Sequence, residues 1–222
     1  HANVNCLRQV EYAILPRDMV TLESQIALVT GGAKRIGRAT ALALAREGVN
    51  VVVHYGASKE DAETLAHEIE RIGGRAWTVQ GDLSDPDAAT AVFDKACAAA
   101  GKCDILINNA SNFPESTFAD FSPADVHAGV NLHALSPALL ARAMHEKGQS
   151  GAVVNMLDCM IADYDRKHLA YHLSKRMLHT LTRIMAVELA PRIRVNAVAP
   201  GLTLPPVDKD ESYLARLASS NP

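Results

Sequence analysis

Short apolar runs rich in β-branched residues alternate along the chain with longer segments of helical period. Six of these runs predict strands, and they occupy residues 26–30, 49–55, 75–80, 104–108, 151–156 and 193–199. The segments between them carry helix punctuation, because Asp85 and Ser122 each stand before a proline, as N-cap residues do. Strands that alternate with helices are typical of a parallel sheet with crossover helices. The pattern predicts a single α/β domain, a doubly wound parallel sheet with five helices in a three-layer α/β/α arrangement.

The two longest helical segments lie in the second half of the chain. One is predicted over residues 123–147, where Pro137 would introduce a kink. The other is predicted from about His168 to Pro191, a residue that cannot continue a helix. After Pro200 the chain is short and polar, and only residues 211–219 have helical character.

Length and charge limit the function classes to which the chain can belong. With 222 residues it is long enough for one large domain, which we expect over residues 24–222 after an extension at residues 1–23. Its 22 Lys and Arg residues against 25 Asp and Glu residues give a net charge of −3, which offers no electrostatic surface for nucleic acid or an anionic membrane. No apolar run approaches the roughly 20 residues of a membrane span. We expect neither nucleic acid nor membrane as a partner.

The spacing of cysteines and histidines gives no sign of a metal site. The cysteines form no CxxC pair and stand at Cys6, Cys97, Cys103 and Cys159. Isolated thiols of this kind fit a reduced, cytoplasmic setting. Packing or solvation is the simpler interpretation of the histidines within helical patterns, which are His67, His127, His133 and His179. No metal is therefore expected.

A glycine-rich segment, TGGAKRIG at residues 30–37, joins the first strand to the first helix. Such a turn exposes backbone N–H groups to a pyrophosphate at the positive end of the helix. Gly31 would permit the tight turn, and Gly37 would permit close packing of the helix on the strand. A plain strand-to-helix connection is the alternative interpretation. The segment favours binding of a dinucleotide.

Four motifs in order resemble the short-chain dehydrogenase/reductase family over residues 24–203. TGGAKRIG is similar to the family's TGxxxGxG motif, with Arg35 in place of the middle glycine. The others are NNA at residues 108–110, Asn131 in the following helix, and Tyr171 with Lys175 as YxxxK; NAVAPG at 196–201 resembles a further family segment. The resemblance implies a Rossmann-type fold and a nicotinamide cofactor. Family members continue with further helices and a seventh strand. The sequence is expected either to be shortened or to lack these elements, and an active enzyme whose full-length form continues further is favoured.

The end of the second predicted strand bears on which nicotinamide cofactor is bound. NAD-binding proteins hold the ribose 2′-hydroxyl with an acidic residue at this point. Here residues 54–58, HYGAS, supply no carboxylate. A 2′-phosphate could instead meet Ser58 and the charges of Lys34 or Arg35. Lys59 is another candidate, and a solvated lysine is the simpler interpretation of it. The sequence therefore predicts NADPH, or NADP in its oxidised form.

The resemblance carries a wider set of cofactor contacts onto this chain. They are Gly31, Lys34, Arg35, Ile36, Gly37, His54, Tyr55, Ser58, Asp82, Leu83, Asn109, Ala110, Ser111, Tyr171, Lys175, Pro200 and Gly201. Asp82 and Leu83 follow the third strand, where family members contact the adenine. A simple turn or cap is the alternative role for Asp82.

Tyr171 and Lys175 lie one turn apart on a single face of a predicted helix. A free tyrosine, with a pKa of about 10, exchanges protons poorly near neutrality. A lysine ammonium close to the hydroxyl would lower that pKa, at an interaction energy of about 4 kcal/mol for a separation near 4 Å. The family resemblance implies that Tyr171 and Lys175 are catalytic and that Asn131 anchors a water molecule in a proton relay.

Asp158 stands 13 residues before Tyr171, where the family usually has a serine. Together with Arg35 in the glycine loop, and with Ser111 and Phe113 after the NNA motif, it makes the chain resemble the pteridine reductases. That resemblance implies hydride transfer from NADPH to a ring C=N, with Asp158 and Tyr171 supplying the proton. Phe113 would stack on the flat substrate, Ser111 would line its pocket, and Arg35 would hydrogen-bond the pterin or the phosphates. Alternatively, Asp158 caps a turn and Phe113 plugs a loop.

Two other functions stay open at this point. One is a carbonyl reductase for a ketone or 3-oxoacyl group, although a carboxylate at residue 158 suits it poorly. The other is a catalytically idle NADPH-binding protein. For a pteridine reductase or a carbonyl reductase, the partner is a small molecule: a pterin, a folate-like compound or a ketone. Members of the family commonly form tetramers, so a homo-oligomer is expected.

Overall fold

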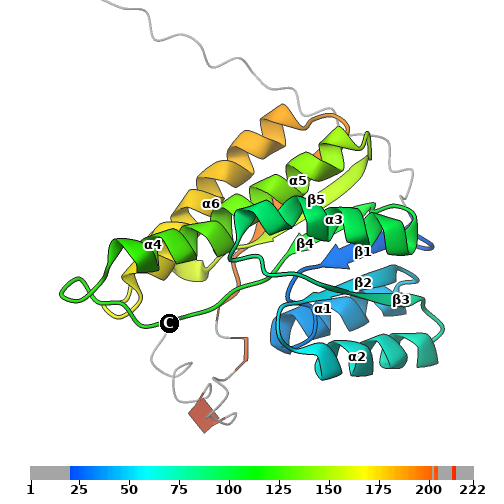
Figure 1. Ribbon diagram of the computed structural model, residues 1–222, viewed down its shortest axis with the longest axis horizontal. Helices are drawn as coiled ribbons and strands as arrows, with labels where there is room; N and C mark the ends of the chain where they lie inside the picture. The colour runs from blue at the N-terminus through cyan, green and yellow to red at the C-terminus, as the bar shows by residue number, and fades with distance from the viewer. Residues whose placement is uncertain (1–20, 202, 205–211, 214–222) are drawn as a thin grey trace, which may run out of the picture.

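The computed structural model describes residues 21–201, 203–204 and 212–213 (Figure 1). The strands in this part of the chain are β1 (Ile26–Val29), β2 (Asn50–Tyr55), β3 (Ala76–Gln80), β4 (Ile105–Asn108), β5 (Gly151–Met156) and β6 (Ile193–Val198). The helices are α1 (Arg35–Arg46), α2 (Lys59–Arg71), α3 (Pro86–Ala100), α4 (Pro123–Val130), α5 (Ser136–Glu146) and α6 (Leu169–Glu188), with two short turns, η1 (Asn131–Leu135) and η2 (Cys159–Ile161). All six predicted strands are confirmed.

The sheet is parallel throughout, with strand order β3-β2-β1-β4-β5-β6. The chain runs outward from β1 to β3, crosses back to β4 beside β1, and then continues outward to β6. This is the order of a Rossmann-type doubly wound sheet, and the switch point lies between β1 and β4. The carboxyl ends of the strands meet at one edge, so the segments after β1, β4 and β5 come together there.

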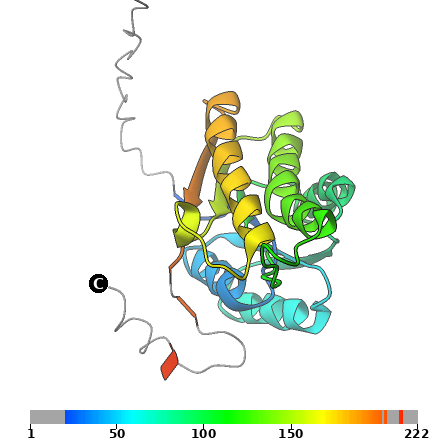
Figure 2. The same cartoon turned by 90° about the vertical axis from the view of Figure 1, so that its left-hand side faces the viewer.

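Alternate residues of each central strand face opposite helical layers. Leu28 of β1 belongs to the core that contains Phe93 of α3 and Leu140 of α5. Its neighbour Val29 belongs to the core that contains Leu65 of α2. Figure 2 shows α1 and α2 on one side of the molecule and α5 and α6 on the other. The three-layer prediction is therefore confirmed.

The α1–α2 layer covers only part of its face of the sheet. Within the described residues, α1 and α2 pack against β1, β2 and β3. Over β4 and β5 a groove of about 600 Å³ is lined by Ile107, Val154 and neighbouring residues. Strand β6 forms the edge of the sheet in this part of the chain, and Val198 at its end is half exposed.

The helix predicted over residues 123–147 is interrupted by the π-helical turn η1, so α4 and α5 are separate elements. The prediction placed the irregularity at Pro137, but the turn that widens lies just before it. Pro137 has no N–H for the carbonyl of His133, and its ring crowds that carbonyl, which falls inside the widened turn. The division gives six α-helices where five were predicted.

The other long helix, α6, begins after its N-cap His168 and ends at Glu188, as predicted. Residues 1–20 of the predicted extension lie outside the described residues. So does most of the helical segment at 211–219, of which Ser212 and Tyr213 are described and helical. In the part of the chain that the structure describes, no helix is long and apolar enough to cross a membrane.

Candidate active site

The loop between β1 and α1 is packed too closely for side chains at its glycines. Gly31 has a φ of +57°, and a Cβ there would lie 2.9 Å from the Cα of Ala110. A Cβ on Gly37 would lie 2.3 Å from the carbonyl oxygen of Gly31. Arg35, in place of the motif's middle glycine, adopts a left-handed φ of +52°. The side chain of the N-cap, Lys34, makes no capping bond to the first turn of α1, so that positive helix end can receive an anion.

Thr30 and Asn109 brace this loop from the β4 side. Nδ2 of Asn109 donates hydrogen bonds to the carbonyl oxygens of Thr30 (2.9 Å) and Gly31 (3.0 Å). Oγ1 of Thr30 accepts from the backbone N–H groups of Asn109 (2.9 Å) and Ala110 (3.0 Å). The Asn109 side chain therefore shapes the cofactor loop from within the protein. Sequence reasoning missed Thr30, although it is the last residue before the glycines.

His54, predicted as a cofactor contact, is a buried link between the glycine loop and the end of β3. Its Nδ1 accepts from the backbone N–H of Gly31 at 3.2 Å, so Nε2 carries the hydrogen and donates to the carbonyl of Gly81 at 3.1 Å. Burial lowers the pKa of His54 to about 4. The neutral imidazole can therefore position the loop through two neutral hydrogen bonds.

Positive charge gathers where the glycine loop meets the start of α2. Lys34, Arg35 and Arg38 line a cavity of about 540 Å³ between α1 and α2, which Glu60 and Asp61 also line. Nζ of Lys34 lies 3.0 Å from a carboxylate oxygen of Asp61. Ser58 is the N-cap of α2, and its side chain makes no capping bond. The contact of Lys34, Arg35 and Ser58 with a cofactor phosphate stays a prediction.

Several other predicted cofactor contacts have evident structural roles. Oδ1 of Asp82 accepts from the backbone N–H (2.9 Å) and the hydroxyl (2.7 Å) of Ser84, which is the simple turn named as its alternative role. Tyr55 and Leu83 are buried in the core. Ile36 is half-buried at the start of α1. Their direct contact with a cofactor stays a prediction.

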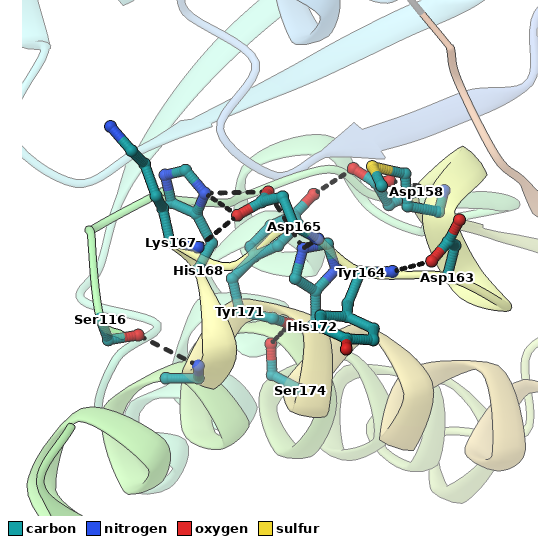
Figure 3. A network of polar contacts seen from close by, with 12 residues as sticks. Ser116, Asp158, Asp163, Tyr164, Asp165, Lys167, His168, Tyr171, His172 and Ser174 are labelled. Carbon is teal, nitrogen blue, oxygen red and sulfur yellow. Dashed lines mark hydrogen bonds and ion pairs between the residues drawn. The ribbon is translucent and has the colours of Figure 1, made fainter. Parts of the chain in front are cut away.

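Asp158 and Tyr171 are joined directly at the end of β5 (Figure 3). The hydroxyl of Tyr171 donates to Oδ2 of Asp158 at 2.9 Å. The other oxygen, Oδ1, accepts from the backbone N–H of Met160 at 2.8 Å, so Asp158 also caps the turn η2. The N–H of Cys159 donates to the carbonyl of Pro200 at 3.2 Å, which brings the segment after β6 beside the pair. Gly201 follows it at an exposed position.

The acidity of Tyr171 differs from the sequence prediction. Burial raises its pKa well above the ordinary tyrosine value, and the charge of Asp158 and its hydrogen bond raise it further. Lys175 was predicted to lower this pKa, but its Nζ donates to the carbonyl of Met156 at 2.7 Å and lies 5.6 Å from the centre of the tyrosine ring. Burial lowers the pKa of Lys175 to about 8. Tyr171 is therefore a protonated phenol throughout the neutral range.

Phe113 lies beside the tyrosine, on the loop after β4. Its ring meets that of Tyr171 edge-to-face with centres 4.6 Å apart, and 54% of its surface is exposed. One neighbour was not predicted, because the ring of His168 stacks on it with centres 3.6 Å apart. The loop therefore presents an aromatic side chain at the acid–base pair.

His133 is a second residue that sequence reasoning did not place at the site. It is fully buried in η1, the turn that begins at Asn131 and packs against α6. Nε2 accepts from the N–H of Asn112 and lies 3.2 Å from the hydroxyl of Ser111, so Nδ1 carries the hydrogen and donates to Ser174 at 2.8 Å. Burial, with a smaller effect of Lys175, lowers its pKa to about 3. The neutral ring joins the pocket loop to α6, and no spacing pattern marks it in the sequence.

The structure thus brings the glycine loop, the segment at residues 109–113, Asp158 and Tyr171 to one edge of the sheet. The glycine cradle and the uncapped start of α1 fit a pyrophosphate, and the cationic cavity fits a further phosphate. The pair at the end of β5 can hold and exchange a proton. Together these features fit a site for a nucleotide cofactor beside a tyrosine–carboxylate pair.

Comparison with known proteins agrees with this geometry. Residues 25–213 match the short chain dehydrogenase family (adh_short). The chain is 36% identical to pteridine reductase 1 of Leishmania tarentolae, with 82% of this chain and 78% of that protein covered. It is 33% identical over 187 residues to a 3-oxoacyl-acyl-carrier-protein reductase of Synechocystis sp., covering 82% of this chain and 76% of that protein.

A solved structure gives the same assignment. FolM alternative dihydrofolate reductase 1 from Brucella canis, complexed with NADP, matches with a TM-score of 0.83 and 36% identity, covering 91% of this chain and 81% of that one. The chain belongs to the short-chain dehydrogenase family and is an oxidoreductase. The solved structures of FolM from Brucella canis and Brucella suis and of a short chain dehydrogenase from Burkholderia cenocepacia are complexes with NADP, which agrees with the missing carboxylate after β2 and with the basic side chains beside the glycine loop in this chain.

Proposed function

We propose that the chain is an NADPH-dependent reductase of a pterin or dihydrofolate-type ring, acting on a C=N bond. The observation that carries this proposal is the hydrogen bond from Tyr171 to Asp158. A carboxylate that accepts the phenol's hydrogen bond gives the site a second group that can relay a proton, which ketone reduction through one tyrosine does not require. The similarity to pteridine reductase 1 and to FolM supports the same substrate class.

The cofactor would be held by the glycine loop at Gly31 and Gly37, with Lys34 and Arg35 at its phosphate end. When bound, it supplies the hydride that is added to the ring carbon. The chain's own residues supply the proton. Tyr171 stays protonated at neutral pH and gives its hydroxyl proton to the neighbouring ring nitrogen. The Asp158 carboxylate, in direct contact with that hydroxyl, then relays a proton from solvent back to Tyr171.

The remaining predicted residues have supporting roles in this proposal. Phe113 offers an exposed aromatic face at the site, against which a flat heterocycle can lie. Ser111 and Arg35 are proposed substrate contacts, and Arg35 could bind the ring or the phosphates with its planar guanidinium. Lys175 is proposed to bind the nicotinamide ribose, and Asn131 to anchor a water molecule in the relay.

A carbonyl reductase is the second candidate, because the chain also resembles a 3-oxoacyl reductase. The contact between Asp158 and Tyr171 argues against it. A panel assay separates the two, with NADPH oxidation followed by absorbance against dihydropterins, dihydrofolate, ketones and 3-oxoacyl esters. Turnover confined to ketones or 3-oxoacyl esters would support the second candidate. An absence of turnover with every substrate, at normal NADPH affinity, would support an idle cofactor-binding protein.

We also propose that the chain forms a homo-oligomer, a tetramer by analogy with the family, and that it acts in the cytoplasm. Apolar side chains exposed along α6 support self-association, and they are Leu173, Met177, Ile184 and Val187. Light scattering on the protein as it elutes from a size-exclusion column would give its mass. A monomer mass at micromolar concentration would exclude the oligomer.

A further inference from the structure

Three titratable residues gather at the start of α6 and on the segment that leads into it (Figure 3). Asp165 lies in the loop after η2, His168 is the N-cap of α6, and His172 lies one turn further along the helix. Nδ1 of His168 lies 2.8 and 2.9 Å from the two carboxylate oxygens of Asp165. The backbone N–H of Asp165 donates to Nε2 of His172 at 3.1 Å, which ties the loop to the helix. None of these residues has a part in the proton transfer described above.

The carboxylate fixes both the tautomer and the orientation of the His168 ring. Because the oxygens of Asp165 accept, Nδ1 of His168 carries the hydrogen. The backbone N–H of Lys167 also donates to Asp165, at 2.7 Å. Burial raises the pKa of Asp165, but the hydrogen bonds from the Lys167 N–H and from His168 outweigh it and hold the pKa below its usual value. Asp165 is thus a charged acceptor, and the imidazole it binds is only slightly exposed.

The ring of His168 lies flat on the ring of Phe113. Their centres are 3.6 Å apart and their planes differ by 17°, whereas the ring of Tyr171 stands at 87° to Phe113. Phe113 itself belongs to a loop without regular structure. Its orientation at the site therefore depends on these two neighbours, one of which is held by Asp165.

The backbone holds the two loops in register at the same place. The N–H of Ser116 donates to the carbonyl of Lys167 at 2.7 Å, and the N–H of Leu169 donates to the carbonyl of Ser116 at 2.8 Å. Oγ of Ser116 accepts from the N–H of Ala170 at 3.1 Å. The contact between the loops thus does not depend on the His168 side chain, so that side chain can be changed with the bridge intact.

We propose that Asp165 and His168 are positioning residues for substrate binding, which hold the Phe113 ring as a fixed wall perpendicular to Tyr171. Resting on the proposed function, the inference names the substrate class more closely: a flat heteroaromatic ring that lies on Phe113 while Tyr171 reaches its edge. The contacts that link Asp165 to His168 and His168 to Phe113 favour a planar substrate. A flexible acyl chain would gain little from it.

The first test needs no substrate. The chain has four phenylalanines, so the ring protons of Phe113 can be assigned by NMR of phenylalanine-labelled protein with a Phe113→Leu reference. In the parent these protons are expected upfield, because the imidazole is stacked on the ring. His168→Phe should keep the shift, His168→Leu should abolish it, and the matched change His179→Leu, at an exposed position on α6, should leave it unchanged. Retention of the parent shift in His168→Leu would overturn the proposed stack.

The second test measures binding on the same variants, with pterin fluorescence for the substrate site and NADPH fluorescence for the cofactor site. His168→Leu should weaken pterin binding about tenfold, the order expected for one aromatic pair, with an NADPH Kd within about twofold of the parent. His168→Phe should restore pterin affinity, and Asp165→Asn should lie between the two. Equal losses in His168→Phe and His168→Leu, or parallel losses of pterin and NADPH, would contradict a positioning role.

Failure of the inference and failure of the proposed function give different results. A parent protein that binds and reduces pterins, with His168→Leu unchanged, overturns the positioning role alone. A parent protein that binds no pterin overturns the proposed function and the substrate class inferred from it. The Phe113 shift then decides whether His168 positions the ring.

Discussion

The hydroxyl of Tyr171 donates a hydrogen bond to Asp158 across 2.9 Å, and it joins the start of α6 to the end of β5. The contact has two consequences. It satisfies one oxygen of a half-buried carboxylate, whose other oxygen caps η2. It also raises the pKa of the phenol, together with burial, so that Tyr171 keeps its proton throughout the neutral range.

Replacement of the tyrosine tests the proton donor. Tyr171→Phe should reduce kcat by about 10² to 10⁴, because proton transfer to the substrate is lost, while the Kd for NADPH changes little. Tyr164→Phe is the matched control, since Tyr164 is an exposed tyrosine of the neighbouring loop. Steady-state kinetics and NADPH titration measure the two effects. Near-normal turnover in Tyr171→Phe would remove this residue from the chemistry.

Replacement of Phe113 tests the aromatic wall. Phe113→Ala should weaken substrate binding by about 1–3 kcal/mol, on the scale of base stacking against an aromatic side chain. NADPH binding should be nearly unaffected. Phe118→Ala is the control, because Phe118 lies on the same loop and is 82% exposed. An equal loss of affinity for cofactor and substrate would indicate collapse of the loop instead.

The buried His54 should make folding stability depend on pH. Its folded pKa of about 4 lies below the unfolded value of 6.5, so the unfolded state binds more protons between these values. Stability should be complete above pH 6.5 and fall by about 3 kcal/mol as the pH drops to 4, at 1.36 kcal/mol per unit. His54→Gln should flatten this dependence in urea unfolding series, and His67→Gln, at an exposed position, should not. An unchanged slope in His54→Gln would contradict the buried neutral imidazole.

The cationic cavity should distinguish the two nicotinamide cofactors. Lys34→Ala should weaken NADPH binding by about 1 kcal/mol and NADH binding by less, because only NADPH carries the 2′-phosphate. Asp61→Asn should have the opposite sign, since it frees Lys34 from its ion pair. Lys59→Ala serves as the control. It removes a lysine at the start of α2, the helix that also carries Asp61, and this lysine is paired with Glu63. Equal effects of Lys34→Ala on the Kd of both cofactors would place the 2′-phosphate elsewhere.

Much of the fold follows from local pattern. Alternation of apolar runs with capped helices is sufficient for the six strands, and the carboxyl ends of parallel strands necessarily share an edge. The glycine loop was predictable because Gly31 and Gly37 serve steric needs that no other residue meets. The spacing of Asp158 and Tyr171 pointed to one site, although the direct contact required the turn η2 that Asp158 caps.

What the sequence could not provide depends on contacts between distant loops. The pKa of Tyr171 has the opposite direction from the prediction, because burial and Asp158 outweigh a lysine whose Nζ is directed to Met156. His133 and His168 became relevant only when the segment at residues 111–116 was placed against α6. No periodicity or spacing encodes that arrangement.

The most direct test of the account is the rate of dihydropterin reduction by Asp158→Asn, beside Asp158→Ser and the parent. Asn keeps the shape of the side chain but cannot give up or regain a proton, so pterin reduction should fall steeply while folding and the NADPH Kd persist. Ser restores the hydroxyl that is usual in the family, so ketone reduction should be intact or improved while pterin reduction is lost. If both variants reduce dihydropterins at the parent rate, Asp158 is only the cap of η2, and the proposed substrate class is wrong.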